Sequence, residues 1–257
     1  MITISETIKT TWKEFVGHFP AWAKLVLPVA VIGVIYALLD EWYGASSLAP
    51  GQLPLAAPGG WPPGIYFAAV IIFAIAYAWM NVVVILNADR ILGGKQIDAD
   101  TTYKLGWQKV VNAFFVSVMY GLVVVGGLLL LIVPGIIFAM RYSLALQAAV
   151  LEDKRGWNAM RRSAELTKGR YASVFSLFFV PNLVFGIGVA LLATIPSIVA
   201  SFVGSVIAPG SSLDSFAIRA TLSSIDSVMS ALTFPLAVIV SVLVYRAFRD
   251  SVPTPAK

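Results

Sequence analysis

Long runs of apolar residues dominate this sequence. Several exceed the roughly 18 residues at which a membrane-spanning helix becomes the default interpretation. Hydrophobic residues make up 59% of the chain and charged residues only 12%, where globular domains carry about 25% charged residues. We therefore expect an all-α membrane protein with six transmembrane helices, forming a single integral membrane domain over residues 1–257. The predicted spans are Pro20–Leu39, Ile65–Leu86, Val110–Val133, Ile136–Leu151, Ala172–Ile195 and Val228–Arg246.

Lysine and arginine are distributed unevenly between the connections of these spans. The connection 40–64 has none and the connection 196–227 has only Arg219, whereas 87–109, 152–171 and the terminal segments hold almost all the others. Because cytoplasmic connections collect Lys and Arg, this asymmetry predicts that both termini lie in the cytoplasm. Topology also accounts for the net charge of +5, so we expect no nucleic-acid partner.

The segment before the first span, residues 3–19, has the periodicity of an amphipathic helix. Thr3 and Glu6 form a capping-box pattern, and Lys9 and Lys13 lie off the apolar stripe. The stripe consists of Ile4, Ile8, Phe15 and Phe19. Aromatic residues on one face and lysines off it favour a helix in the membrane interface over a soluble helix packed on the bundle.

The same combination of elements recurs along the chain. Segments 99–109 and 157–171 are also amphipathic and also precede predicted spans. This recurrence predicts about three interfacial helices and three parallel pseudo-repeats, each a helix followed by a transmembrane hairpin, at 1–90, 98–153 and 156–250.

Residues able to support catalysis are scarce. The chain has no cysteine and one histidine, His18, and its 13 acidic residues lie outside the cores of the predicted spans. Paired carboxylates, histidine clusters and proton relays across the bilayer are therefore not expected. The sequence predicts a non-enzymatic protein with no catalytic residue, no metal site and no cofactor.

Arg141 is the one charge that lies well inside a predicted span, because Lys24 and Arg246 lie near the ends of theirs. It lies six residues after the Pro134-Gly135 turn, which corresponds to a depth of about 9 Å at 1.5 Å per residue. Ser143 and Gln147 place polar groups on other sides of this helix, which predicts that protein surrounds it. We therefore expect Arg141 to hold an anionic group in a recess of the outer leaflet. The predicted ligand-binding residues are Arg141, Ser143, Gln147 and Asn182.

A simpler role for Arg141 is open at this point. An arginine at that depth reaches the outer headgroups by extending its side chain along the helix. It can equally pair with Asp40, Glu41 or Asp226, which lie at outer ends of predicted spans.

The segment 154–170 is the most basic part of the chain. Its bases share a predicted helix with Trp157 and Met160, and each base near an anionic leaflet adds about 1 kcal/mol of binding. The positive-inside bias of a loop explains the same residues equally well. The predicted lipid-headgroup residues are Arg161, Arg162, Lys168 and Arg170.

Residues 128–175 contain a pattern that resembles a known family. The pattern consists of Pro134-Gly135-Ile136, Arg141-Tyr142-Ser143, Glu152, and Ala159 with Arg162-Ser163, Leu166-Thr167 and Gly169. It is similar to the membrane domain attached to some bacterial glycerophosphoryl diester phosphodiesterases, which also occurs as stand-alone polytopic proteins. Two departures are Gln147, where proline is expected, and Ala164, where tryptophan is expected. The resemblance implies a six-helix protein of the bacterial inner membrane and supplies no activity.

These features favour one function and leave two alternatives. The first expectation is a non-enzymatic inner-membrane protein that engages lipid or an anionic amphiphile. A permease-like transporter or channel for a small solute is the second, and a scaffold subunit of a membrane complex is the third. The expected partners are membrane lipids, with a membrane-protein partner or a second copy as further candidates.

Overall fold

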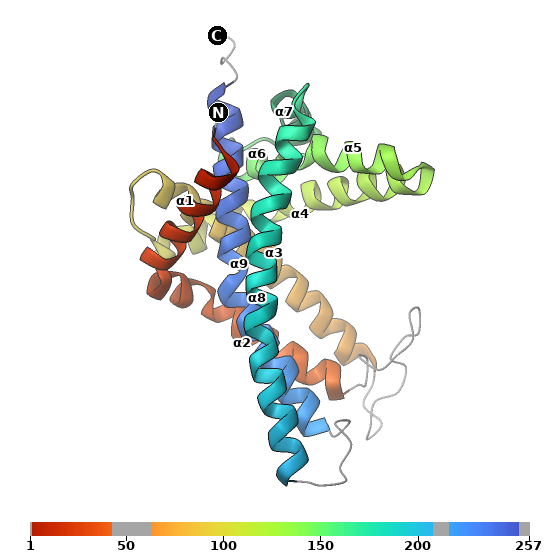
Figure 1. The fold of residues 1–257 in the computed structure, drawn as a ribbon. Helices are drawn as coiled ribbons and strands as arrows, with labels where there is room; N and C mark the ends of the chain where they lie inside the picture. The colour runs from red at the N-terminus through yellow and green to blue at the C-terminus, as the bar shows by residue number, and fades with distance from the viewer. Residues whose placement is uncertain (1, 43–62, 208–215, 252–257) are drawn as a thin grey trace. The chain divides into compact units, whose positions relative to one another are not determined.

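A computed structural model describes residues 2–42, 63–207 and 216–251 of the chain. Within these ranges the chain is helical and contains no strand. The helices are α1 Ile4–Gly17, α2 Phe19–Trp42, α3 Pro63–Leu92, α4 Ala99–Leu130, α5 Ile132–Tyr142, α6 Ala145–Leu151, α7 Trp157–Thr167, α8 Tyr171–Ile207 and α9 Phe216–Ser251 (Figure 1).

Six helical stretches are long and apolar enough to cross a membrane, which confirms the predicted fold class. They are Phe19–Trp42, Gly64–Leu92, Ala99–Leu130, Ile132–Leu151, Tyr171–Pro196 and Arg219–Ser251. Most helices are longer than the predicted spans because they continue into the polar connections. α4, for example, begins at Ala99, where the side chain of Asp98 accepts a hydrogen bond from the N–H of Thr101 and caps the helix.

Two details of the predicted fourth span are wrong. The helix is interrupted at Ser143-Leu144, so α5 and α6 replace one continuous helix over 136–151. The turn before it is centred on Leu131, the one extended residue between α4 and α5, with φ −163° and ψ 148°. Pro134 lies inside the first turn of α5, where its missing N–H would have had no helical partner.

α1 confirms the predicted capping box. The side chain of Thr3 accepts a hydrogen bond from the N–H of Glu6, and the N–H of Thr3 donates to the Glu6 carboxylate. The buried face consists of Thr7, Thr11 and Phe15. The exposed large apolar residues of α1 are Trp12 and Val16, and Phe19 at the start of α2 is exposed as well.

The chain divides into two compact units. The first comprises Met1–Trp22, Ala78–Phe185 and Pro235–Lys257, and the second comprises Ala23–Tyr77 and Gly186–Phe234. These boundaries do not follow the three predicted pseudo-repeats, which stay a prediction.

The first unit has an apolar core that joins sequence segments far apart. It brings together residues of α4 to α8 with the C-terminal part of α9. Its largest fully buried members include Leu144, Met160, Leu166, Tyr245 and Phe248. This core holds α7 against α5 and α6, and it therefore positions the basic residues of α7.

Polar side chains hold other elements of the first unit together. Buried Asn87 donates to the hydroxyl of Thr102 and accepts from the N–H of Asp98, which fixes the end of α3 against the start of α4. Lys109 donates to the carbonyl of Val150 and pairs with Asp153 at 2.7 Å, which fixes α4 against the end of α6.

The second unit combines parts of α2, α3, α8 and α9. Tyr36 and Phe73 stack with ring centroids 4.8 Å apart. Glu41 is buried and accepts hydrogen bonds from Arg219 and Ser223, both at 2.9 Å. This ion pair joins the end of α2 to the start of α9 within the unit.

Candidate functional site

The interruption between α5 and α6 is stabilised by a serine from α7. Ending α5 frees the carbonyl of Arg141 and the N–H of Leu144 from their helical partners. The hydroxyl of Ser163 donates to that carbonyl at 2.9 Å and accepts from that N–H at 3.1 Å. Because Ser163 is fully buried, these bonds satisfy backbone groups that would otherwise be costly to bury.

The same carbonyl brings Arg141 to the C-terminal end of α7. The hydroxyl of Thr167 donates to the carbonyl of Arg141 at 3.0 Å, and the N–H of Arg170 donates to the carbonyl of Thr167. Gly169 adopts φ 73°, a left-handed conformation that turns the chain from α7 into α8. Arg141, Lys168 and Arg170 therefore share one place in the fold, which we name the junction cluster.

The cations of the junction cluster lack carboxylate partners in the part of the chain that the structure describes. The side chain of Arg141 is exposed and lies 5.6 Å from the centroid of the Tyr142 ring. Lys168 is exposed as well. Arg170 donates to the hydroxyl of Ser251 and lies 5.9 Å from the centroid of the Phe248 ring.

Most other arginines are already neutralised. Carboxylates lie within ion-pair distance of Arg90, Arg161, Arg162, Arg219, Arg246 and Arg249. An anionic group that approached these six would have to compete with a neighbouring acid. The junction cluster presents no such competitor among the described residues, so an anionic group can approach it without displacing an acid.

Two of the predicted headgroup residues have partners outside the cluster. Arg162 donates to both carboxylate oxygens of Glu152, and the Tyr245 hydroxyl donates to Oε1 of the same carboxylate. Arg161 pairs with Glu165 on the exposed face of α7. Of the four predicted headgroup residues, Lys168 and Arg170 thus join Arg141, while Arg161 and Arg162 do not.

The Glu152 carboxylate is held in its charged form. Burial would raise its pKa, but the hydrogen bonds from Tyr245 and Arg162 and the charge of Arg162 outweigh it, so the pKa lies below its ordinary value of 4.5. Burial would lower the pKa of Arg162, and the Glu152 carboxylate reverses that effect and raises it. Sequence reasoning missed this network because Tyr245 is 93 residues from Glu152.

This lowered pKa predicts an acid-sensitive contribution to stability. A group whose pKa is lower in the folded state stabilises the fold above its unfolded pKa, and the stabilisation is lost as the pH falls through the folded pKa. We expect wild type to be more stable than Glu152→Gln at pH 6 and the difference to shrink below about pH 4.5, the ordinary value. Thermal midpoints of both proteins between pH 6 and pH 3.5 measure this. A difference that is constant with pH would contradict the assignment.

Among the described residues, the polar groups of the remaining predicted ligand-binding residues make no hydrogen bond to the side chains of the junction cluster. Ser143 donates to the carbonyl of Met140, and Asn182 on α8 donates to the carbonyl of Phe178 in its own helix. Gln147 is buried in α6, and its Oε1 has no hydrogen-bond partner among the described residues.

Two of the three acids proposed as simple partners of Arg141, Asp40 and Glu41, have other partners. Glu41 binds Arg219 and Ser223, and Asp40 accepts a hydrogen bond from Tyr66. All of these residues belong to the second unit, whereas Arg141 belongs to the first. The pairing of Arg141 with Asp40 or Glu41 therefore receives no support from these contacts.

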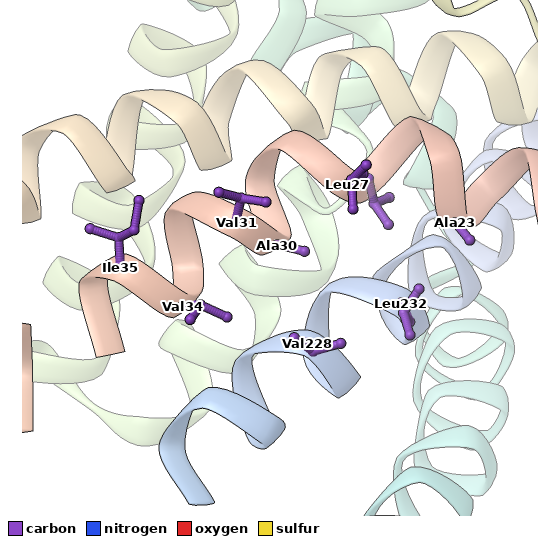
Figure 2. Close-up of a pocket in the computed structure, with 9 residues that line it drawn as sticks. Ala23, Leu27, Ala30, Val31, Val34, Ile35, Val228 and Leu232 are labelled. Atoms are coloured by element: carbon purple, nitrogen blue, oxygen red, sulfur yellow. The ribbon is translucent and has the colours of Figure 1, made fainter. Parts of the chain in front are cut away.

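The second unit contains a pocket of about 280 Å³ between α2 and α9 (Figure 2). Apolar side chains line it: Ala23, Val26, Leu27, Ala30, Val31, Val34, Ile35, Val228 and Leu232. Such a lining offers contact to a hydrocarbon chain and no hydrogen bond to a polar solute. Elsewhere in the described ranges, no group of three His, Asp or Glu side chains is placed to hold a metal ion.

The apolar helices define the class of this chain, which is a multi-pass α-helical membrane protein. Comparisons with protein-family models, with curated proteins and with solved structures find no match to it. The resemblance to the phosphodiesterase-associated membrane domain therefore stays a prediction.

Proposed function

We propose that this protein binds anionic phospholipid through the junction cluster of Arg141, Lys168 and Arg170. The observation that carries the proposal is that Thr167 binds the backbone carbonyl of Arg141 at the end of α7 that leads to Lys168 and Arg170. None of these three cations forms an ion pair with a carboxylate among the described residues. A lipid phosphate supplies the missing negative charge. Three bases at about 1 kcal/mol each give about 3 kcal/mol, or roughly a hundredfold preference for anionic over neutral lipid.

The exposed surfaces of α1 and α7 support the same proposal. Trp12 and Val16 are exposed on α1 together with Lys9 and Lys13, and Trp157 is exposed at the start of α7. Indole rings beside lysine and arginine side chains suit the headgroup level of a bilayer. We place these helices at the cytoplasmic face of the bacterial inner membrane, with both termini on that side, on the grounds of the uneven distribution of bases.

Lipid-dependent stabilisation tests the cluster. Phosphatidylglycerol added to the detergent-solubilised protein should raise the thermal midpoint of wild type, and phosphatidylcholine should do so less. Arg141→Gln should lose about a third of the free-energy difference between the two lipids, because it removes one of the three bases. Arg141→Lys should recover only part of it, because lysine keeps the charge but cannot make two parallel hydrogen bonds to a phosphate.

Arg155→Gln is the matched control. Arg155 is exposed in the basic segment before α7 and has no carboxylate partner among the described residues, but it lies outside the junction cluster. This variant should respond to phosphatidylglycerol as wild type does. If wild type, Arg141→Gln and Arg155→Gln respond equally, the cluster does not bind the lipid.

A further inference from the structure

The turn between α4 and α5 exposes an unusually apolar surface. Residues 121–140 contain no side chain with a hydrogen-bonding group. The side chains at the turn are exposed in the isolated chain, from 66% for Val133 to 83% for Leu129. A turn that emerged into water would leave this surface solvated, which is strongly unfavourable.

The position of α7 shows which part of α4 and α5 lies among water and headgroups. Ser163 and Thr167 bind the carbonyl of Arg141, so α7 lies beside the C-terminal end of α5. Exposed charges on and directly after α7 require water or headgroups around them. These charges belong to Arg161, Glu165 and Lys168. The boundary between polar surroundings and hydrocarbon therefore lies near Arg141.

The helical hairpin formed by the end of α4 and by α5, from Tyr120 to Arg141, is too short to cross a bilayer. The Tyr120 hydroxyl donates to the carbonyl of Ala139, so Tyr120 on α4 lies close to the level of Arg141 on α5. From Tyr120 to Leu130 a helix rises about 15 Å at 1.5 Å per residue. The hydrocarbon core is about 30 Å thick, so the turn reaches at most the middle of the bilayer.

The backbone of the turn fits an apolar medium. Leu131 alone leaves the helices, its N–H donates to the carbonyl of Gly127, and its carbonyl accepts from the N–H of Gly135. Pro134 contributes no N–H at the start of α5, where helix donors normally lack partners. Such a compact turn limits the number of unpaired backbone groups, each of which is costly in hydrocarbon.

We propose that the chain from Tyr120 in α4 to Arg141 in α5 forms a re-entrant hairpin, which enters and leaves the bilayer on the same side. The turn at Leu131 lies in the hydrocarbon, and lipid acyl chains contact it. The chain then crosses the bilayer completely with α2, α3, α8 and α9. This arrangement keeps both termini on one side, and it does not depend on phospholipid binding by the junction cluster.

Single-cysteine variants test the proposal cleanly, because the natural chain contains no cysteine. Leu131→Cys marks the turn, and since Leu131 is exposed and outside the helices, the change removes little packing. Ser47→Cys marks the predicted outer connection and Lys95→Cys the predicted inner one. A charged, membrane-impermeant maleimide should label Ser47→Cys only from outside and Lys95→Cys only from inside. It should label Leu131→Cys at least tenfold more slowly from both sides, and readily in denaturing detergent.

A nitroxide attached to Leu131→Cys in proteoliposomes identifies what covers the turn. Lipid contact gives high collision rates with oxygen and low rates with a water-soluble nickel chelate. Rapid maleimide labelling from outside would overturn the proposal, because the hairpin would then cross the bilayer. Low collision rates with both reagents would also overturn it, because protein, such as a second copy, would then cover the turn. Thermal midpoints equal to wild type within about 2 °C establish that each variant is folded.

Discussion

Replacing Gly127 with alanine is expected to force α4 and α5 apart, whereas the same change at the neighbouring Gly126 is not. A Cβ atom at Gly127 would lie 2.7 Å from Cδ2 of Phe138 and 2.9 Å from the Cα of Gly135. The second contact is with backbone, so a side-chain rotation cannot relieve it. We expect a loss of about 1–3 kcal/mol, the usual cost of overpacking.

Gly126 is the matched control for this change. A Cβ atom there meets nothing within 4 Å, so Gly126→Ala should be neutral or stabilise the protein through helix propensity by up to about 1 kcal/mol. Gly135→Ala should resemble Gly127→Ala, because its Cβ atom would lie 2.8 Å from the backbone nitrogen of Leu128. Thermal midpoints in detergent measure all three. Equal midpoints for Gly126→Ala and Gly127→Ala would show that the two helices do not pack closely at this point.

Replacing Glu152 with glutamine is expected to destabilise the first unit by about 3 kcal/mol. The side chains of Glu152 and Arg162 are each only 19% exposed, so the change removes the closest charge partner of a largely desolvated guanidinium and leaves it only Glu165, at 3.9 Å. Breaking a buried ion pair costs about 3–5 kcal/mol, and the remaining solvent access puts this pair at the lower end. At roughly 2–4 °C per kcal/mol, the thermal midpoint should fall by about 6–12 °C.

Glu165→Gln provides the control, because Glu165 is the exposed acid that also lies near Arg162, at 3.9 Å. Glu165 pairs with Arg161 at 3.4 Å, but these side chains are 52% and 75% exposed, so the pair is worth less than about 1 kcal/mol. Tyr245→Phe should cost less than Glu152→Gln, because it removes one of several hydrogen bonds to the carboxylate. A small loss for Glu152→Gln, equal to that for Glu165→Gln, would contradict the importance of the network.

Local signals in the sequence predicted the helices well. Apolar runs identified the six membrane-length helical stretches, and Thr3 with Glu6 identified the start of α1, because both signals depend on residues close together in the chain. The turn predicted at Pro134-Gly135 lies a few residues earlier in the structure, at Leu131. Proline does not mark the turn itself here, because it is also tolerated within the first turn of a helix.

The candidate site depended on contacts that no local pattern encodes. The sequence prediction put Arg141 in the outer leaflet from its depth along one helix. That reasoning could not include α7, whose Ser163 and Thr167 bind the carbonyl of Arg141 from 22 and 26 residues away. Sequence alone also could not separate Arg162, which binds Glu152, from Lys168, which is exposed. The Ser-x-x-x-Thr spacing on α7 was the available signal, because it places both hydroxyls on one helix face.

The composition of the first unit from three separate stretches has a consequence for biosynthesis. Val240, Val244, Tyr245 and Phe248 belong to the same core as the residues of α5 to α8. A ribosome produces the α4–α7 region well before it produces these side chains, so the nascent chain carries Glu152 and Arg162 without Tyr245 beside them. Insertion of the last helix therefore completes the core of the first unit, and a polypeptide that is truncated before residue 235 would present that core to quality-control proteases.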